Sequence, residues 1–317
     1  MIDNILVDTL VTGLPMAPMF LGIYLTLRIR QDFDLTVEGS FPLGAAVTAV
    51  AMTHGVPAWV ALILGVASGG ASGLGTAALH LLLKLPVLMA GLVMTMALFT
   101  VTLRVLGMPT VSLIGVPTIF SPVVSEPGRT ADLWMSAILF AVVAVVFAAF
   151  GLFLKTDLGL ALRASGANAR MVRSQGVNEN ALLILALMAS NGLAALGGGL
   201  MVQVQGYADI NMGVGSFVAG VGAVLVGVLL LNPGGSQVAR IVLAVLIGCL
   251  VYRLVLVSAL RFGLSAGDLK GVTALTLIVA VAAQSYLKPL LGRLQSVLTP
   301  RTHAVDADPL TQERSHA

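Results

Sequence analysis

The sequence predicts an all-α, polytopic membrane protein with about eight or nine transmembrane elements, some of them broken within the bilayer. Of the 317 residues, 58% are apolar and only 10% are charged, and the mean hydropathy is +1.01. A soluble domain of this size would need far more polar surface. The apolar residues form continuous runs, without the strict alternation over about ten residues that marks a transmembrane barrel. The single cysteine, Cys249, lies in such a run, so the chain has no disulfide framework.

The apolar runs follow one another with short polar connections. They occupy residues 5–27, 41–53, 58–83, 85–106, 133–154, 181–204, 217–231, 241–260 and 272–287. The N-terminus is acidic and lacks the cationic start of a signal peptide, so the first run is expected to stay in the mature protein. Residues 107–131, rich in Pro, Ser and Thr, are expected to form an external loop or re-entrant cap. Residues 291–317 are expected to form a polar, disordered tail in the cytoplasm.

Lysine and arginine are distributed unequally between the two sides of this arrangement. With the N-terminus outside, about twelve fall in cytoplasmic segments and about four outside, and the opposite orientation would reverse this excess. The N-terminus is therefore expected outside and the C-terminus in the cytoplasm. The cytoplasmic group is Arg28, Arg30, Lys84, Lys155, Arg163, Arg170, Arg173, Arg240, Lys288, Arg293, Arg301 and Arg314; the external group is Arg104, Arg129, Arg261 and Lys270, and Arg253 lies within a span.

Residues 155–180 form the longest polar interruption between two apolar runs, and their cations place them in the cytoplasm. Within this segment, residues 158–172 are mostly helix-forming, with Leu160, Leu162 and Met171 as apolar contacts. We expect a short helix that lies along the membrane face and is offered to a cytoplasmic partner. The alternative is an ordinary basic loop that only fixes the topology.

Two parts of the chain share a pattern: a span, a short acidic breaker that contains glycine, and a second, shorter span. The first copy enters its second span from the cytoplasm and the second copy from outside. This is an inverted repeat, an arrangement in which broken helices at corresponding places mark a transport route. The alternative is chance similarity between glycine-rich apolar segments. The matched residues are Leu21, Gly22, Leu25, Asp34 and Leu35 with Leu196, Gly197, Leu200, Asp209 and Ile210, and, after one insertion, Gly39, Ser40, Phe41 and Gly44 with Gly215, Ser216, Phe217 and Gly220.

The breaker at residues 34–40 brings two carboxylates within reach of the bilayer, where a buried charge is costly. Thr36 and Ser40 are expected to cap the half-helix that follows. The functional interpretation is a hinge or pathway element near the membrane axis. The alternative is a cytoplasmic turn that holds Asp32, Asp34 and Glu38 in solvent. The matching segment, residues 207–213, would face outside, where a solute is received. The candidate pathway or hinge residues are Asp34, Thr36, Glu38, Gly39, Ser40, Asp209, Asn211, Gly213, Gly215 and Ser216.

Missing motifs exclude several chemistries. The four histidines do not cluster at metal-ligand spacing, and no nucleophilic Ser–His–Asp site is evident. No phosphate-binding Gly-x-x-x-x-Gly-Lys-Ser/Thr sequence is present, so the chain is not expected to be an enzyme or to hydrolyse nucleotide itself. No basic patch is interleaved with aromatic residues, which argues against nucleic-acid binding. Glycine clusters at residues 65–75 and 197–199 are expected to let helices pack closely, with a glycine-lined solute path as the alternative.

In order and spacing, three segments resemble the permease subunits of ABC importers of the branched-chain amino acid and ribose type. They are LGIYL leading to DLTVEGSFPLGAAVTA, the loop sequence ALRASGANARMVRSQGVN, and GYADINMGVGSFVAGVGAVLVG. The resemblance covers about residues 10–290 and is strongest to the permeases of tryptophan/tyrosine-type uptake systems. Many importer permeases carry a Glu-Ala-Ala…Gly coupling sequence, whereas this chain has no acidic residue between Gly159 and Asn178.

The resemblance implies that residues 1–290 form a transmembrane permease domain, surrounded by lipid, in a bacterial inner membrane. Two permease subunits, expected to be identical, would form the pathway between them. Cytoplasmic ABC ATPase subunits would bind ATP and Mg²⁺, and an external substrate-binding lipoprotein would deliver an amino acid or similar small solute. No cofactor is expected on this chain itself. The implied ATPase-coupling residues are Leu160, Arg163, Ala164, Gly166, Asn168, Arg170, Met171, Gly176 and Val177.

Two other classes of protein stay open. Inverted repeats also occur in ion-coupled secondary carriers. Such carriers usually have acidic residues in mid-span, whereas the acidic residues here lie at span ends and in breakers. A non-transporting membrane scaffold would be favoured if the breakers were plain loops.

Overall fold

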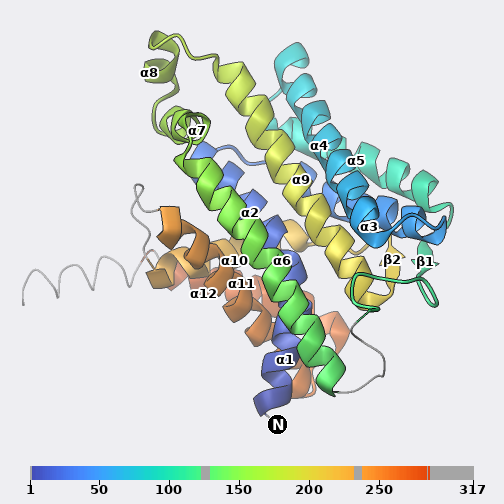
Figure 1. Ribbon diagram of the computed structural model, residues 1–317. Coiled ribbons are helices and arrows are strands. Elements are labelled where there is room, and N and C mark those ends of the chain that lie inside the picture. The colour runs from blue at the N-terminus through green and yellow to red at the C-terminus, as the bar shows by residue number, and fades with distance from the viewer. Residues whose placement is uncertain (1, 123–128, 232–237, 284, 286–317) are drawn as a thin grey trace, which may run out of the picture.

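The computed structural model describes residues 2–122, 129–231, 238–283 and 285, and these are almost entirely helical (Figure 1). The predicted all-α architecture is therefore confirmed. The predicted tail, residues 291–317, lies outside the described residues, as do parts of the predicted external loop and of the ninth apolar run.

Each predicted apolar run corresponds to a helix in the described part of the chain. The first is one span that runs from α1 (Ile2–Gly13) through η1 (Leu14–Met16) and α2 (Ala17–Tyr24) to the π-helical η2 (Leu25–Arg30). Within the described ranges, 6 spans are long and apolar enough to cross a membrane, so the protein is multi-pass. The other helices of this set are α3 (Thr36–Thr53), α4 (Ala58–Leu83), α5 (Val87–Leu106), α6 (Arg129–Lys155), α9 (Glu179–Gln205), α10 (Ser216–Leu231), α11 (Val238–Arg261) and α12 (Leu269–Ala282).

The internal repeat appears as a two-fold relation between α2 and α9, which cross with opposite chain directions (Figure 1). A Cβ atom added to Gly22 would lie 2.6 Å from the carbonyl oxygen of Ser190. A Cβ atom added to the matched Gly197 would lie 2.9 Å from the carbonyl oxygen of Pro15. Pro15 and Ser190 are separated by the same offset as the two glycines, so the crossing is reciprocal. Because the two helices run in opposite directions, the repeat is inverted, as predicted.

The second helix of each copy packs against the first helix of the other copy. Gly44 of α3 lies so close to α9 that a side chain there would overlap the backbone of Ala195. The matched Gly220 of α10 lies against Phe20 of α2, and Ala195 and Phe20 correspond in the repeat. The approach at Gly44 needs glycine, because a side chain would push the two backbones apart, whereas an added Cβ atom at Gly220 would meet the side chains of Ile23 and Phe20. The core of the protein is therefore a symmetrical arrangement of α2 and α9 with α3 and α10.

The glycines of α4 also serve packing. Gly69 lies against Ala195 and Asn191 of α9, and Gly73 lies against Leu187 one turn away. At these two contacts no room is left between the helices for a solute, whereas Gly70 of the same cluster lines a cavity of about 510 Å³ between α4, α6 and α9. The predicted packing role therefore holds for these two glycines.

Small elements mark the two ends of the bundle, and α9 connects them (Figure 1). At one end, α7 (Asp157–Ala167) and α8 (Ala169–Ser174) follow α6. At the other, β1 (Thr110–Ser112) pairs antiparallel with β2 (Tyr207–Asp209), and η3 (Ala266–Asp268) precedes α12. The single helix predicted over residues 158–172 is in fact two helices. Asn168 adopts an extended conformation between them, and its side-chain oxygen accepts the N–H of Met171 at 3.1 Å, which caps α8.

Candidate functional site

A network of buried polar side chains joins the first breaker to α9. Asp34 is fully buried; its Oδ1 accepts the N–H of Thr36 at 2.9 Å and its Oδ2 accepts Nδ2 of Asn191 at 2.7 Å. Through its own oxygen, Asn191 accepts the hydroxyl of Ser40 at 2.7 Å. The predicted capping by Thr36 and Ser40 was wrong, because Asp34 supplies the side-chain bond to the free N–H at the start of α3, while both hydroxyls bond within the bundle.

Hydroxyl pairs extend this network into α4. Ser40 Oγ lies 2.6 Å from Ser72 Oγ, and Thr36 Oγ1 lies 2.7 Å from Thr76 Oγ1. None of these side chains, Asp34 included, is more than 3% exposed. The alternative of a solvated turn is therefore wrong for Asp34, since the surrounding helices exclude water from it. A buried network in which each group is paired fixes the relative positions of α3, α4 and α9.

Glu38 brings the two breakers together. Its Oε1 accepts the N–H of Gly215 at 2.8 Å, and Gly213 lies against its carbonyl group. The neighbouring Gly39 faces α5 instead, where an added Cβ atom would lie 3.0 Å from the side chain of Leu98. The first breaker therefore connects α5 to the loop that enters α10. Gly215 has a φ of 81°, a conformation that favours glycine.

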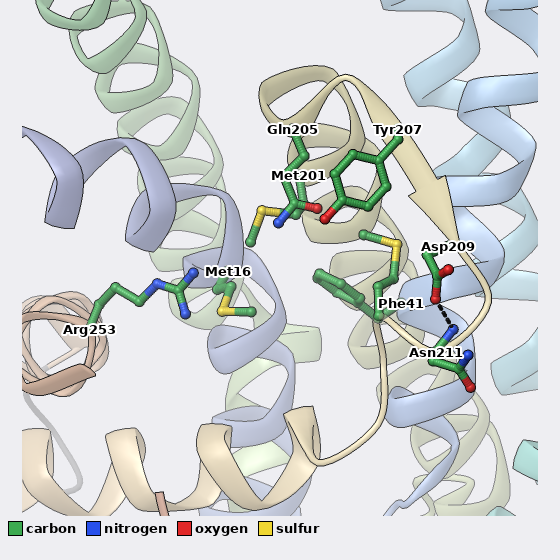
Figure 2. A pocket seen from close by; sticks show the side chains of 9 residues that line it. Met16, Phe41, Met201, Gln205, Tyr207, Asp209, Asn211 and Arg253 are labelled. Carbon is green, nitrogen blue, oxygen red and sulfur yellow. Dashed lines mark hydrogen bonds between the residues drawn. The ribbon is translucent and has the colours of Figure 1, made fainter. Parts of the chain in front are cut away.

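A cavity of about 350 Å³ opens at the end of the bundle that carries the two strands (Figure 2). Two predicted pathway residues, Asp209 and Asn211, line it. Asp209 accepts the hydroxyl of Thr110 at 2.6 Å and the N–H of Asn211 at 2.7 Å. Apolar side chains, three of them methionines, form much of the wall. The lining residues are Met16, Phe41, Met201, Gln205, Tyr207, Asp209, Asn211, Met212 and Arg253.

A second cavity of about 360 Å³ shares Met16, Met212 and Arg253 with the first and reaches two further predicted residues, Gly215 and Ser216. The hydroxyl of Ser216 donates to the carbonyl of Gly213 at 2.6 Å at the start of α10. The predicted pathway residues therefore fall into three groups. Four residues of the second breaker line the two cavities: Asp209, Asn211, Gly215 and Ser216. Asp34, Thr36 and Ser40 of the first breaker lie in the buried network, and Glu38, Gly39 and Gly213 line a small cavity of about 80 Å³ where the two breakers meet.

Arg253 is a site residue that our sequence analysis did not select. It lies on α11, inside a span, and lines both cavities; Figure 2 shows its side chain at the first of them. Its Nε donates to the hydroxyl of Thr12 at 3.1 Å. Among the described residues, no carboxylate lies within ion-pair distance of its guanidinium. A charged residue within an apolar run was the signal that could have found it.

The opposite end of the bundle presents apolar and cationic side chains on α7 and α8. Leu160 is 58% exposed and Met171 is 51% exposed, although both are apolar. The predicted coupling residues that are exposed are Leu160, Asn168, Arg170, Met171, Gly176 and Val177, and those that are half-buried are Arg163, Ala164 and Gly166. An exposed apolar surface with cations beside it fits a docking surface for another protein.

The inner side of α7 lies directly on the end of the first span. Gly166 is so close to η2 that a Cβ atom would overlap the carbonyl group of Ile29. Beside it, Arg30 is only 8% exposed; it donates to Ser165 Oγ at 2.9 Å and forms ion pairs with Asp32 at 3.1 Å and Glu179 at 3.5 Å. Burial raises the pKa of the Asp32 carboxyl, and the Arg30 charge offsets part of that rise. These contacts tie α7 to η2 and α9.

These features are typical of a transport protein. Some of the apolar helices form an inverted repeat, cavities open at one end of the bundle, and an exposed cationic segment lies at the other end. The class of protein that this arrangement defines is a multi-pass membrane permease.

The comparisons with known proteins agree with this class. Residues 5–282 match the family described as "Branched-chain amino acid transport system / permease component", and the chain belongs to this family. It is 30% identical over 296 residues to the "Tyrosine transport system permease protein" of Clostridioides difficile (strain R20291), covering 93% of this chain and 96% of the relative. It is 34% identical over 282 residues to "Uncharacterized protein RP368" of Rickettsia prowazekii (strain Madrid E), covering 88% and 98%. No solved structure matches the chain.

Proposed function

We propose that the chain is the permease subunit of an ABC importer that takes up an amino acid into a bacterial cell. The observation that carries this proposal is the segment α7–α8, which exposes Leu160 and Met171 on one side and packs on η2 on the other. Family membership and the name of the tyrosine-transport relative support an amino acid as the solute. In this proposal α7–α8 is the surface that an ABC ATPase subunit holds, and the ATPase binds the ATP and Mg²⁺.

The rest of the assembly follows from the same proposal. Two copies of the chain form the pathway between them in the plasma membrane, with the N-terminus outside and the C-terminus in the cytoplasm. An external binding protein delivers the solute at the β1–β2 end. This orientation is supported by the excess of Lys and Arg in the loops on the α7–α8 side.

The contacts of α7 suggest how the ATPase would move the permease. A shift of α7 presses on the backbone of Ile29, because Gly166 leaves no gap between them. The π-helical turn that contains Ile29 is a geometry often found at functional sites. It continues within a few residues to Asp34, whose network holds α3, α4 and α9 together. Movement at the ATPase would therefore reach α3 as a displacement of packed elements.

Leu160→Asp tests this proposal. Burial of a leucine side chain contributes about 1.5–3 kcal/mol, so we expect the amount of ATPase that co-purifies with the variant from native membranes to fall about tenfold or more. The matched control is Ile114→Asp, which changes an even more exposed apolar residue at the opposite end of the bundle. Equal ATPase recovery with both variants would contradict the proposal.

One observation favours a second candidate, an ion-coupled carrier. Asp34 is buried among helices with only neutral side-chain partners, and a carboxylate in such a place is typical of ion pathways. This candidate predicts uptake by vesicles that contain the permease without any ATPase, and loss of that uptake when an uncoupler is added. Uptake that needs both ATP and the ATPase would exclude it.

A further inference from the structure

A groove between α6 and α11 is apolar along its length and ends at a cation. Its volume is about 390 Å³, and among its described lining residues only Lys155, the last residue of α6, is charged. Leu152 and Leu243 at its edge are 65% and 50% exposed. Exposed leucine side chains on membrane spans face the hydrocarbon of the bilayer. The groove therefore opens toward lipid.

Gly151 leaves the space that forms this groove. A Cβ atom added there would lie 3.5 Å from Val242 and 3.9 Å from Val238, both at side-chain atoms of α11. These are ordinary contact distances, so the two backbones do not require glycine here. The absence of a side chain at residue 151 therefore provides room between the helices, and a larger residue would occupy that room.

The length and position of the groove match one leaflet of a bilayer. From Phe147 to Lys155 the lining covers about 12 Å of α6 at about 1.5 Å per residue. Half of the hydrocarbon core measures about 15 Å. The chain leaves the span directly after Lys155, where Thr156 caps α7 by accepting the N–H of Gly159 at 3.3 Å (Figure 1). Lys155 therefore lies where lipid head groups begin.

The charge at this end of the groove is not balanced by the protein. Lys155 is exposed and forms no ion pair within the described ranges, and no described acidic residue lines the groove. Arg240, one residue after the lining residue Ala239, is also exposed and forms no ion pair with a described residue. Each such cation near a membrane surface raises the affinity for an anionic lipid about fivefold.

Another cavity shows what the groove adds. The cavity of about 510 Å³ beside Gly70 is larger and also apolar, but no charged residue is among its described lining. It can accept an acyl chain without distinguishing one head group from another. The α6–α11 groove combines room for a chain with a cation at the membrane surface, which is the combination that recognises a head group.

We propose that the α6–α11 groove binds an anionic phospholipid. One acyl chain lies along Gly151 and Val242, the ammonium of Lys155 donates hydrogen bonds to the phosphate, and Arg240 adds a second positive charge. A zwitterionic phospholipid offers the same tails but brings its own cation to this site, so it binds more weakly. This binding depends neither on which solute is transported nor on the ATPase.

The test is native mass spectrometry of the full-length permease purified in detergent. The protein is titrated with phosphatidylglycerol and with phosphatidylethanolamine of the same acyl chains, and the bound lipids are counted. We expect the wild-type protein to bind phosphatidylglycerol at least fivefold more tightly. Lys155→Gln should lower this preference about fivefold, and Lys155→Arg should retain it. Gly151→Leu, which fills the groove, should lower the binding of both lipids several-fold.

Two matched variants serve as controls. Lys84→Gln removes an exposed lysine at the end of α4, on the same side of the bundle, and Gly70→Leu fills the cavity that carries no charge. Both are expected to change the preference for phosphatidylglycerol by less than twofold. Glycerol phosphate, which has the head group without the tails, should not displace the lipid at equal concentration.

Several results would overturn the proposal. Equal binding of the two lipids by the wild-type protein would do so, as would an unchanged preference in Lys155→Gln or an equal loss in Lys84→Gln. Displacement by glycerol phosphate would indicate a site for a soluble phosphate. If Gly151→Leu converted a dimer into a monomer without changing lipid binding, the groove would be an interface between two copies of the chain instead.

Discussion

Exchanging the two side chains that meet in the buried network tests whether this network holds the permease core together. In the wild-type protein Asn191 donates to Asp34 at 2.7 Å. Asp34→Asn places an amide donor opposite either Asn191 or the N–H of Thr36, and Asn191→Asp brings two carboxyl groups together. The double exchange restores one donor and one acceptor, with their positions reversed.

The expected magnitudes follow from the contacts. Each single exchange leaves a buried polar group without a partner, which costs about 1–3 kcal/mol of the free energy of unfolding. Asn191→Asp also removes the bond to the carbonyl of Leu187 at 2.9 Å, which adds about 1 kcal/mol. The double exchange still lacks the bond to Leu187, but both groups that the single exchanges leave without a partner are paired again. We therefore expect the double exchange to be more stable than the sum of the singles by about 2–6 kcal/mol.

The measurement is the free energy of unfolding of the purified permease in mixed micelles, titrated with a denaturing detergent. Asn180→Asp serves as control, because Asn180 is exposed on the first turn of the same helix. Its effect is expected to stay within about 0.5 kcal/mol. Strict additivity of the two exchanges, or single exchanges that cost nothing, would show that the Asp34–Asn191 contact does not stabilise the core.

Two further predictions concern glycines. Gly44→Val is expected to lower the free energy of unfolding by about 1–3 kcal/mol, because the side chain would overlap Ala195. Gly271→Val, where no atom lies near, should cost clearly less in the same titration, and equal costs would argue against the reciprocal packing. Gly166→Ala should displace α7 from Ile29 and lower ATP-driven uptake while the ATPase still co-purifies. Normal uptake would show that this contact does not transmit movement.

Much of the fold was predictable because its signals are local. A run of apolar residues identifies a span whatever its neighbours are, and all nine predicted runs correspond to helices in the described part of the chain. The repeat could be predicted from the sequence because a close approach of two backbones requires glycine at Gly22 and at Gly197, and this leaves matching glycines in the two copies. The break at Asn168 was missed, since a side-chain cap inside a helix-forming segment is decided by one residue's backbone conformation.

The sequence by itself determined that the chain crosses a membrane and where its apolar helices lie, since hydropathy is a property of neighbouring residues. It indicated an inverted repeat, which the reciprocal contacts of Gly22 and Gly197 then confirmed. Only the tertiary structure decided that Asp34 is buried and bonded to Asn191, and that Arg253 and Asp209 face one cavity. These relations join residues far apart in the chain. The burial of a carboxylate or the partner of a guanidinium depends on which helices pack around it, and no local pattern records that.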